Sequence, residues 1–143
     1  MIRCQSSAWL LCAITLLSST WTASAQEWTR FRGPNGSGES EARSVPAKWT
    51  DKQVNFNVEV PGIGHSSPVL WGDKLFILSA NPDDATRHTL CFDAKTGKKL
   101  WQKSFPSQKH QLHKQSSYAS SSAAVDDKHV YFAWAAPKSI TLT

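Results

Sequence analysis

The segment SSPVL at residues 66–70 returns as SSAAV at residues 121–125, and KLFI at residues 74–77 returns as HVYF at residues 129–132. Both matches have the same offset of 55 residues. Two separate matches at one offset indicate an internal repeat, in which each copy is one supersecondary unit. Residues 75–77 and 130–132 are apolar and rich in β-branched or aromatic residues, which is typical of strands. The repeat therefore predicts two successive copies of one antiparallel β-sheet unit within residues 66–143.

The first copy contains four segments with strand character, separated by turns and loops rich in Gly, Asp and Asn. A polar loop at residues 106–120 follows it and explains why the offset exceeds the about 40–45 residues of a common four-stranded propeller blade. The second copy has room for three strands. We place the strands of the first copy at residues 67–71, 75–80, 88–93 and 98–105, and those of the second at residues 121–125, 129–132 and 139–143.

Apolar and polar residues alternate strictly over residues 54–60 (VNFNVEV), which predicts one further half-buried strand. The preceding residues 26–53 are rich in Gly, Pro and polar residues, so we expect an extended lead-in there. Trp28, Phe31 and Trp49 are the side chains expected to pin this lead-in to the domain. No amphipathic helical period occurs after residue 25, and the expected fold class is all-β.

The first 25 residues have the layout of a secretory signal peptide. Arg3 precedes an apolar run at residues 8–17, and the small-residue triplet ASA follows at residues 23–25. The run is shorter than the roughly 20 residues of a membrane-spanning helix, so cleavage near Ala25 is favoured over an uncleaved anchor. A lipoprotein is disfavoured because a leucine precedes Cys12. We therefore expect a secreted or periplasmic protein with no transmembrane segment.

Removal of residues 1–25 leaves 15 Lys and Arg against 11 Asp and Glu, because that segment holds one of the 16 basic residues and none of the acidic ones. The resulting net charge of +4 is mild, and the basic residues are scattered. Nucleic-acid-binding surfaces concentrate positive charge in a stripe, so no nucleic-acid partner is expected. Cys91 is then the single cysteine, and we expect it to be buried in a strand as a small apolar residue.

The segment CFDAKTGKKLW at residues 91–101 has the chemistry of a tight turn that presents a tryptophan. The side chain of Asp93 can accept hydrogen bonds from the backbone N–H groups that follow it. Gly97 can take the positive φ that the turn needs. Trp101 then returns a large flat side chain to the sheet, where it can bury about 200 Å² against a neighbouring sheet.

This segment resembles the pyrroloquinoline-quinone-type (PQQ-like) β-propeller repeat, whose pattern is Ala-x-Asp-x-x-x-Gly-Lys-x-x-Trp. The match holds at Asp93, Gly97, Lys98 and Trp101, while Cys91 stands where the family usually has Ala. The resemblance implies a β-propeller of four-stranded antiparallel blades. It also implies a structural role for Asp93, Gly97 and Trp101, which would lock one blade to the next.

The resemblance extends to WTRFRGPNGSG at residues 28–38, GHSSP at residues 64–68 and SYAS at residues 117–120, which are similar to segments of large secreted bacterial propeller proteins. On this basis residues 54–143 would form about two blades of an incomplete ring. The expected parts are a strand at residues 54–60, a blade at 66–105, a loop at 106–120 and a partial blade at 121–143.

A propeller needs about four or more blades to close a ring. We therefore expect the chain to be the N-terminal fragment of a longer propeller protein. The alternative is that two or three copies of the chain assemble into one ring.

Two functions follow from the resemblance. Quinoprotein dehydrogenases resemble one another in an axial quinone, a Ca²⁺ held by carboxylate and amide oxygens, an Asp base and often a disulfide between adjacent cysteines. This chain has no adjacent cysteines and no Asp or Glu between Asp93 and Asp126. We therefore expect a binding or assembly scaffold, with a protein or small-molecule ligand on the axial face where the loops meet, and we predict no catalytic residue. The alternative is a PQQ-dependent quinoprotein oxidoreductase whose catalytic blades lie outside this chain, and PQQ is then implied by the resemblance alone.

Histidines provide the candidate metal ligands, namely His65, His110 and His113. A zinc or copper site needs three or four converging ligands, so solvated loop histidines are the favoured interpretation and an approach of His65 to His113 is the alternative. The serines at residues 117–122 lack a Gly-x-Ser-x-Gly elbow and a suitably placed acid, which disfavours a nucleophilic serine. The glycine-rich segment at residues 33–38 lacks the Lys-Ser/Thr ending of a phosphate-binding loop.

Overall fold

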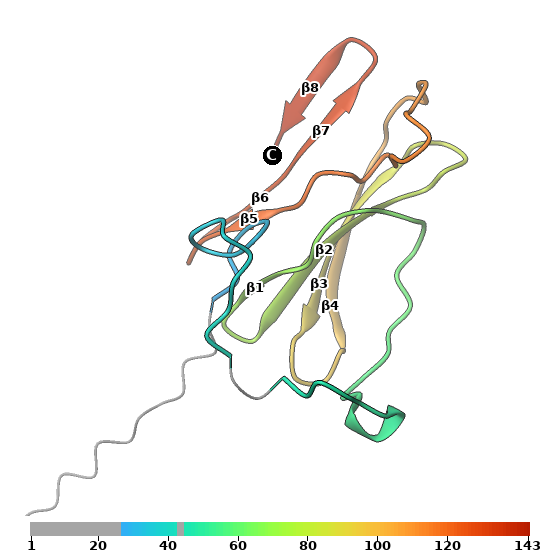
Figure 1. The fold of residues 1–143 in the computed structure, drawn as a ribbon. Helices are drawn as coiled ribbons and strands as arrows, with labels where there is room; N and C mark the ends of the chain where they lie inside the picture. Colours follow the sequence, from blue (N-terminus) through green and yellow to red (C-terminus); the bar gives the residue numbers. More distant parts are fainter. Residues whose placement is uncertain (1–26, 43–44) are drawn as a thin grey trace, which may run out of the picture.

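The computed structural model describes residues 27–42 and 45–143, and this part of the chain is all-β (Figure 1). Its strands form three antiparallel sheets, accompanied by one turn of 3-10 helix, η1 (Asp51–Gln53). Nothing in these two ranges forms an apolar helix of membrane-spanning length. The predicted signal peptide lies outside the described residues.

The first copy of the repeat forms one four-stranded antiparallel sheet in the order β1-β2-β3-β4. The sheet is a simple meander, because each strand pairs with the next one along the chain. All four strands lie close to their predicted bounds, since period-two alternation and turn-forming residues are local signals. They are β1 (Val69–Trp71), β2 (Lys74–Ala80), β3 (Arg87–Asp93) and β4 (Lys99–Phe105).

The second copy forms two short hairpins. In the first, β5 (Ala124–Val125) pairs with β6 (Val130–Tyr131), and in the second, β7 (Ala133–Ala136) pairs with β8 (Ser139–Leu142). Only Phe132 separates β6 from β7. Its N–H donates to the C=O of Thr143 at 2.9 Å, and the N–H of Thr143 donates back at 3.0 Å. The three strands expected here are therefore present, with a break in the middle strand at Phe132.

In both copies a serine that precedes the first strand forms a side-chain hydrogen bond to the backbone at the equivalent residue. Ser66 Oγ accepts from the backbone N–H of Leu78 at 3.2 Å, and Ser121 Oγ donates to the backbone C=O of Ala133. Ser66 and Ser121 are one repeat offset apart, and so are Leu78 and Ala133. The repeat in the sequence is thus also a repeat of structure at these positions.

The hydrophobic core lies between the first sheet and the second copy. Phe76 on β2 pairs with Cys91 on β3, which puts both side chains on one face of the sheet. They belong to one cluster with Val125 and Phe132 of the second copy, and all four are at most 8% exposed. Burial stabilises each large apolar side chain by about 1.5–3 kcal/mol. Cys91 is buried as predicted, and desolvation raises the pKa of its thiol.

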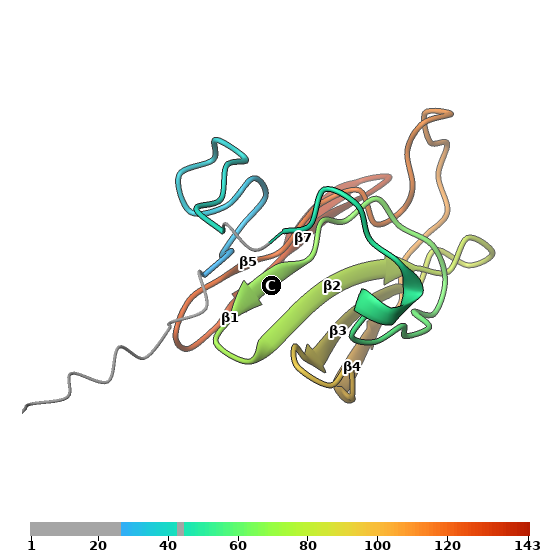
Figure 2. The same ribbon diagram turned by 60° about the horizontal axis from the view of Figure 1, so that its bottom comes forward.

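The lead-in lies where the two copies meet. Trp28 donates a backbone hydrogen bond of 3.1 Å to Leu70 on β1 and accepts one of 2.8 Å from it. The next carbonyl, of Thr29, accepts from the N–H of Val125 on β5 at 2.8 Å. Figure 2 shows this segment, in blue, beside β1 and β5. A short piece of the lead-in backbone, at Trp28 and Thr29, therefore connects the first strands of the two copies.

Of the three aromatic residues expected to pin the lead-in with their side chains, Trp28 is joined to β1 through its backbone instead. The ring of Trp28 packs on Gly33, whose φ is +79° and where a Cβ atom would lie 2.8 Å from the ring. Phe31 and Trp49 are 60% and 77% exposed, so the prediction for these two residues is wrong. The chain around both rings is itself exposed, at residues 30–32 and 45–50, so no packed surface covers them.

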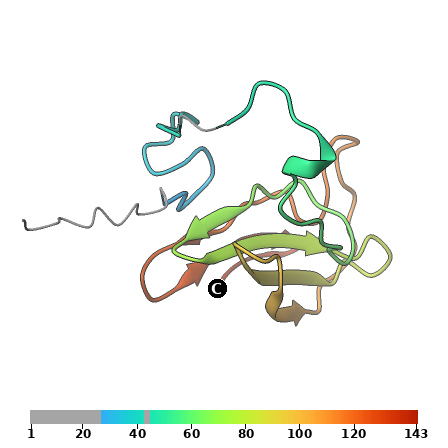
Figure 3. The ribbon, with the colours of Figure 1, turned by 90° about the horizontal axis from the view of Figure 1, so that it is seen from below.

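The strand predicted over residues 54–60 is not formed. A strand needs a neighbour to share its backbone hydrogen bonds, and no sheet of the described part includes this segment. Val54 is 51% exposed, while the ring of Phe56 lies against the turn at Gly97. Figure 3 shows η1 and the chain after it on one side of the four-stranded sheet, with the second copy on the other. Val58 is exposed as well, so the alternation in the sequence produces neither a strand nor a buried face here.

Candidate functional site

Three connections gather at one end of the first sheet, and we call this end the loop face. They are the β2–β3 loop (residues 81–86), the long loop after β4 (residues 106–123) and the β7–β8 turn (residues 137–138). In an antiparallel meander alternate connections lie at the same end, so the turns after β1 and β3 lie at the opposite end. Figure 1 shows the loop face at the upper right. Residues from both repeat copies therefore meet there.

A cleft of about 340 Å³ opens on the loop face, between the loop after β4 and the β7–β8 hairpin. Its volume lies within the range of about 300–1,000 Å³ that small-molecule sites occupy. The lining is mainly apolar, and it contains one arginine and four serines. The lining side chains include Arg87, His110, Leu112, Ser116, Ser117, Tyr118, Ser120, Ser121, Trp134 and Ile140.

Arg87, the first residue of β3, is the charged group of the cleft. The residue is only 5% exposed. Its Nη2 donates to the backbone C=O of Ala135 at 2.9 Å, and its Cζ lies 4.9 Å from the centre of the Tyr118 ring, a cation–π distance. Its Nε is buried and has no hydrogen-bond partner. Burial lowers the pKa of the guanidinium from its ordinary value, because desolvation opposes the charged form.

Arg87 has no acidic partner in the part of the chain that the structure describes. The ion pairs there join Lys95 to Asp73 and His129 to Asp126, both in turns at the opposite end of the sheets. The site therefore presents a buried positive charge whose counter-ion does not come from these residues.

Tyr118 and His110 hold the long loop against this arginine. The hydroxyl of Tyr118 donates to the C=O of His110 at 2.9 Å and accepts from the N–H of the same residue at 3.1 Å. The two rings meet edge to face, with their centroids 5.2 Å apart. One side of the cleft is thus fixed by a double hydrogen bond within the loop.

The histidines proposed as metal ligands are bonded to separate partners. His65 Nδ1 lies 3.0 Å from Ser117 Oγ, and His113 Nδ1 accepts from the N–H of Gln115 at 3.3 Å. His110 Nδ1 lies 3.3 Å from the C=O of Gln108. Within residues 27–42 and 45–143 no three His, Cys, Asp or Glu side chains gather closely enough to hold a metal ion.

The contact between His65 and Ser117 joins the beginning of the first copy to the loop before the second. A nucleophilic serine needs a base that a third group orients. No carboxylate of the described residues is hydrogen-bonded to His65, and Ser117 Oγ also accepts from the N–H of Ala119 at 3.3 Å. This arrangement is that of a structural hydrogen bond.

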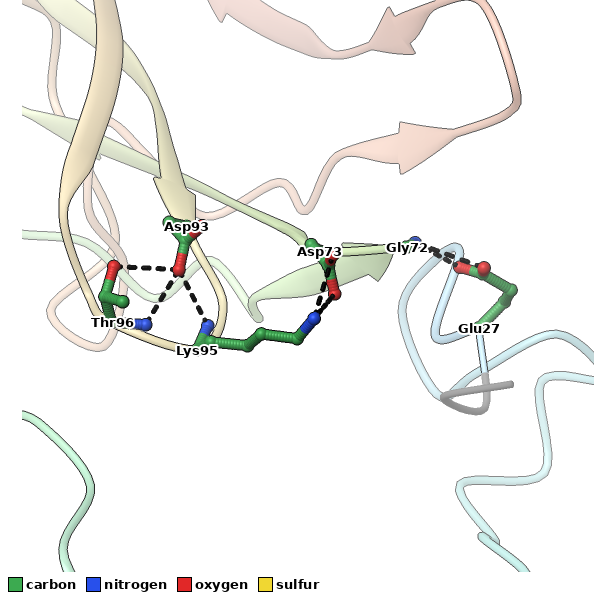
Figure 4. A network of polar contacts seen from close by, with 6 residues as sticks. All are labelled: Glu27, Gly72, Asp73, Asp93, Lys95 and Thr96. Carbon is green, nitrogen blue, oxygen red and sulfur yellow. Dashed lines mark hydrogen bonds and ion pairs between the residues drawn. The ribbon is translucent and has the colours of Figure 1, made fainter. Parts of the chain in front are cut away.

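The turn at residues 93–97 has the hydrogen bonds that its sequence predicts (Figure 4). Asp93 Oδ1 accepts from the N–H of Lys95 at 3.1 Å and from both the N–H and the hydroxyl of Thr96 at 2.8 Å. These bonds, first of all the one from the Thr96 hydroxyl, lower the pKa of Asp93. Gly97 has a φ of +70° and donates its N–H to the C=O of Asp93 at 2.9 Å. The carboxylate of Asp93 and the N–H of Gly97 are thus bonded within the turn.

The neighbouring turn after β1 is tied into the same network. Lys95 Nζ lies 3.0 Å from a carboxylate oxygen of Asp73, and the N–H of Gly72 donates to the carboxylate of Glu27 in the lead-in at 3.0 Å (Figure 4). The Lys95–Asp73 pair is exposed, and exposed pairs contribute little to stability. The network joins the lead-in to the two turns at the end of the sheet opposite the Arg87 cleft.

Trp101, the third residue of the predicted locking device, lies on β4. Its ring is 5.9 Å from the ring of Phe76 on the same sheet, and the residue is 36% exposed. It also lines a cleft of about 190 Å³ whose opposite wall is formed by residues 125–130 of the second copy. Trp101 thus faces the second copy across open space, and its role in locking two blades stays a prediction.

The sequence-based reasoning missed Arg87, Tyr118 and Trp134. A signal for Arg87 exists, because Arg87, Thr89 and Cys91 alternate along one strand and share the face that carries the core. No comparable local signal exists for Tyr118 and Trp134, which reach the cleft through the long loop and the second copy.

Comparison of the chain with protein-family models, curated proteins and solved structures finds no match.

Proposed function

We propose that this chain is part of an exported β-propeller that acts as a binding or assembly scaffold, and that its ligand is bound at the loop face. The observation that carries the proposal is the Arg87 cleft, an apolar recess of small-molecule size with a buried charge inside it. Concave, mainly apolar sites with a few convergent polar groups are the usual form of ligand sites.

The propeller architecture is supported by the relation between the two repeat copies. Neighbouring blades of a propeller place their first strands side by side around a central axis. Here the segments before β1 and β5 lie together, since the N–H of His65 donates to the C=O of Ala119 at 3.0 Å. The PQQ-like turn at residues 93–97 and the signal-peptide layout of residues 1–25 support the blade assignment and the export.

The described residues do not fit a PQQ and Ca²⁺ site. Carboxylates would have to converge on the metal. The cleft is lined by no Asp or Glu of the described part, and the oxygens of Asp93 and Asp126 already accept several hydrogen bonds within their own turns. Binding is therefore the function that we propose, and no redox step is assigned to these side chains.

The test is a fragment screen by nuclear magnetic resonance on the full chain labelled with ¹⁵N. Fragments that bind are expected to shift the amide signals of Leu112, Ala135 and Ile140, which border the cleft, and to leave those of Gly72 and Lys128 unchanged. The change Ile140→Trp should abolish these shifts by filling the cleft. The matched change Leu142→Trp, at a similarly exposed position of β8 that does not line the cleft, should preserve them. Binders that shift only signals away from the loop face would refute the proposal.

Export has its own test. The chain, expressed in a bacterium with a Sec pathway, is expected to be recovered from the periplasm with Gln26 as its first residue, which mass spectrometry of the intact product would show. Recovery of the uncleaved chain from the membrane or the cytoplasm would contradict the predicted signal peptide.

A further inference from the structure

The charge of Arg87 is in an energetically unfavourable environment unless an anion joins it. Burying an ionised group is unfavourable unless it is paired and hydrogen-bonded. Arg87 is 5% exposed, its Nε has no partner, and no acidic side chain of the described residues pairs with it. The hydrogen bond to Ala135 and the Tyr118 ring offset only part of this cost.

The free donors of Arg87 lie in the plane of the guanidinium. This group carries five N–H donors, and the structure uses one nitrogen, Nη2, for the C=O of Ala135. The ring of Tyr118 lies 4.9 Å from Cζ, Nε is buried, and Nη2 bonds to Ala135, so Nη1 is the nitrogen left to donate to a ligand in the cleft. A carboxylate oxygen accepts such charge-assisted hydrogen bonds from a guanidinium.

The four serines of the cleft do not add to a polyanion site, because their hydroxyls are already bonded to other groups of the chain. Ser116 and Ser120 bond to each other at 2.9 Å, Ser121 bonds to the C=O of Ala133, and Ser117 bonds to His65. A phosphate group, with a larger charge and more oxygens, would find too few donors. The donor set therefore fits a single carboxylate.

The other lining residues of the cleft determine which kind of molecule can carry this carboxylate. Leu112, Trp134 and Ile140 form apolar walls, and the volume of about 340 Å³ accommodates one or two fused rings. Trp134 stacks on Phe132, with 5.4 Å between the centroids and 18° between the planes, so a flat wall is held in place.

We propose that the Arg87 cleft binds a small aromatic carboxylic acid, with the carboxylate on the guanidinium and the ring against Trp134. This inference rests on the binding function proposed above and adds the chemical class of the ligand.

The first test titrates the full ¹⁵N-labelled chain with benzoate and, separately, with benzamide, its neutral counterpart of nearly the same shape. Benzoate is expected to shift the indole N–H signal of Trp134 and the amide of Ala135, and to bind at least about tenfold more tightly than benzamide, because a charged hydrogen-bonded pair is lost with the neutral ligand. Equal affinities of the two ligands would overturn the carboxylate assignment while leaving the binding cleft intact.

The second test changes the charge near the cleft without touching Arg87. Ile140 is 82% exposed and lines the cleft, whereas Leu142 on the same strand is 74% exposed and does not line it. Ile140→Lys is expected to strengthen benzoate binding and Ile140→Glu to weaken it, each by about two- to fivefold, since partly screened charges act at the rim. Leu142→Lys and Leu142→Glu should change it much less. The same response at both positions, or none at Ile140, would overturn the proposal.

The third test removes the guanidinium. Arg87→Met keeps most of the side-chain volume, and its folding is checked from the dispersion of the amide spectrum. Benzoate affinity is expected to fall at least about tenfold while benzamide affinity stays within about twofold. If Arg87→Met does not fold, the Ile140 variants still decide the matter. Undiminished benzoate binding by folded Arg87→Met, or no benzoate binding by the unchanged chain, would refute this ligand class, whereas binding of other fragments at the cleft would still uphold the general function.

Discussion

The backbone N–H of Ser67 donates to the side-chain oxygen of Ser122 at 2.9 Å, and these two serines hold the same position in the two repeat copies, 55 residues apart. One copy thus uses its serine hydroxyl to satisfy the backbone of the other. Close to this contact, Val69 of β1 and Ala123 before β5 enter the shared core. The interface between the copies is therefore held by a repeated sequence feature as well as by apolar packing.

Ser122→Ala should weaken the junction between the copies. The change leaves the N–H of Ser67 without its acceptor, which typically costs about 1–3 kcal/mol when the group is partly buried. Urea unfolding followed by tryptophan fluorescence would measure the loss. Ser139→Ala, at an exposed position of β8, is the control and should change stability by less than about 0.5 kcal/mol. Equal effects of the two changes would show that the Ser67–Ser122 bond contributes nothing.

Gly97→Ala should destabilise the chain more than Gly36→Ala. Both glycines have positive φ, at +70° and +73°, so both changes carry a backbone penalty of about 1–2 kcal/mol. At Gly97 the new Cβ would also lie 2.6 Å from the ring of Phe56, while at Gly36 nothing lies within 4 Å. The difference between the two unfolding free energies measures the steric part. The double change Phe56→Ala and Gly97→Ala should lack this steric loss, because the ring is gone. If the effects of the two single changes on the unfolding free energy simply add up in the double variant, the contact between residue 97 and Phe56 is contradicted.

Asp93 should contribute to stability at neutral pH and lose this contribution in acid. Its folded pKa lies below the ordinary 3.8, because Thr96 and Lys95 donate hydrogen bonds to the carboxylate. A lowered folded pKa means that the stabilisation is complete above the unfolded pKa and disappears as the pH falls through the folded one. Thr96→Val should therefore move the pKa of Asp93 back toward its ordinary value, as a ¹³C titration of the carboxyl carbon would show. An unchanged titration midpoint would exclude the Thr96 hydroxyl as the main cause.

Arg87 should prove a poor contributor to stability in the absence of ligand. Arg87→Met replaces a buried, unpaired charge by an apolar chain of similar length, and such changes are often neutral or stabilising. Arg87→Ala leaves a cavity and should be less stable than Arg87→Met by about 1–3 kcal/mol. Thermal unfolding of the three proteins at one pH provides the comparison. A large loss of stability in Arg87→Met would mean that the hydrogen bond from Arg87 to Ala135 outweighs the cost of burying the charge.

The amino-acid sequence by itself determined the parts whose physics is local. The alternation in β2 and β3 and the turn from Asp93 to Gly97 could be predicted, because side-chain period, Asx-type hydrogen bonding and positive φ depend on a few neighbouring residues. The repeat offset likewise predicted that Ser66 and Ser121 would occupy equivalent places.

Only the tertiary structure decided which distant segments of the chain contact each other. Residues 54–60 have a strand pattern but no partner, Phe31 and Trp49 are left exposed, and Trp28 joins β1 to β5. The cleft combines Arg87 of the first copy with Tyr118 of the long loop and Trp134 of the second copy. Such a site depends on how far-apart backbones are brought together by burial of a shared core. The free energy gained by burying apolar surface does not depend on where the buried residues stand in the sequence. For this reason no local sequence pattern predicts the site as a whole.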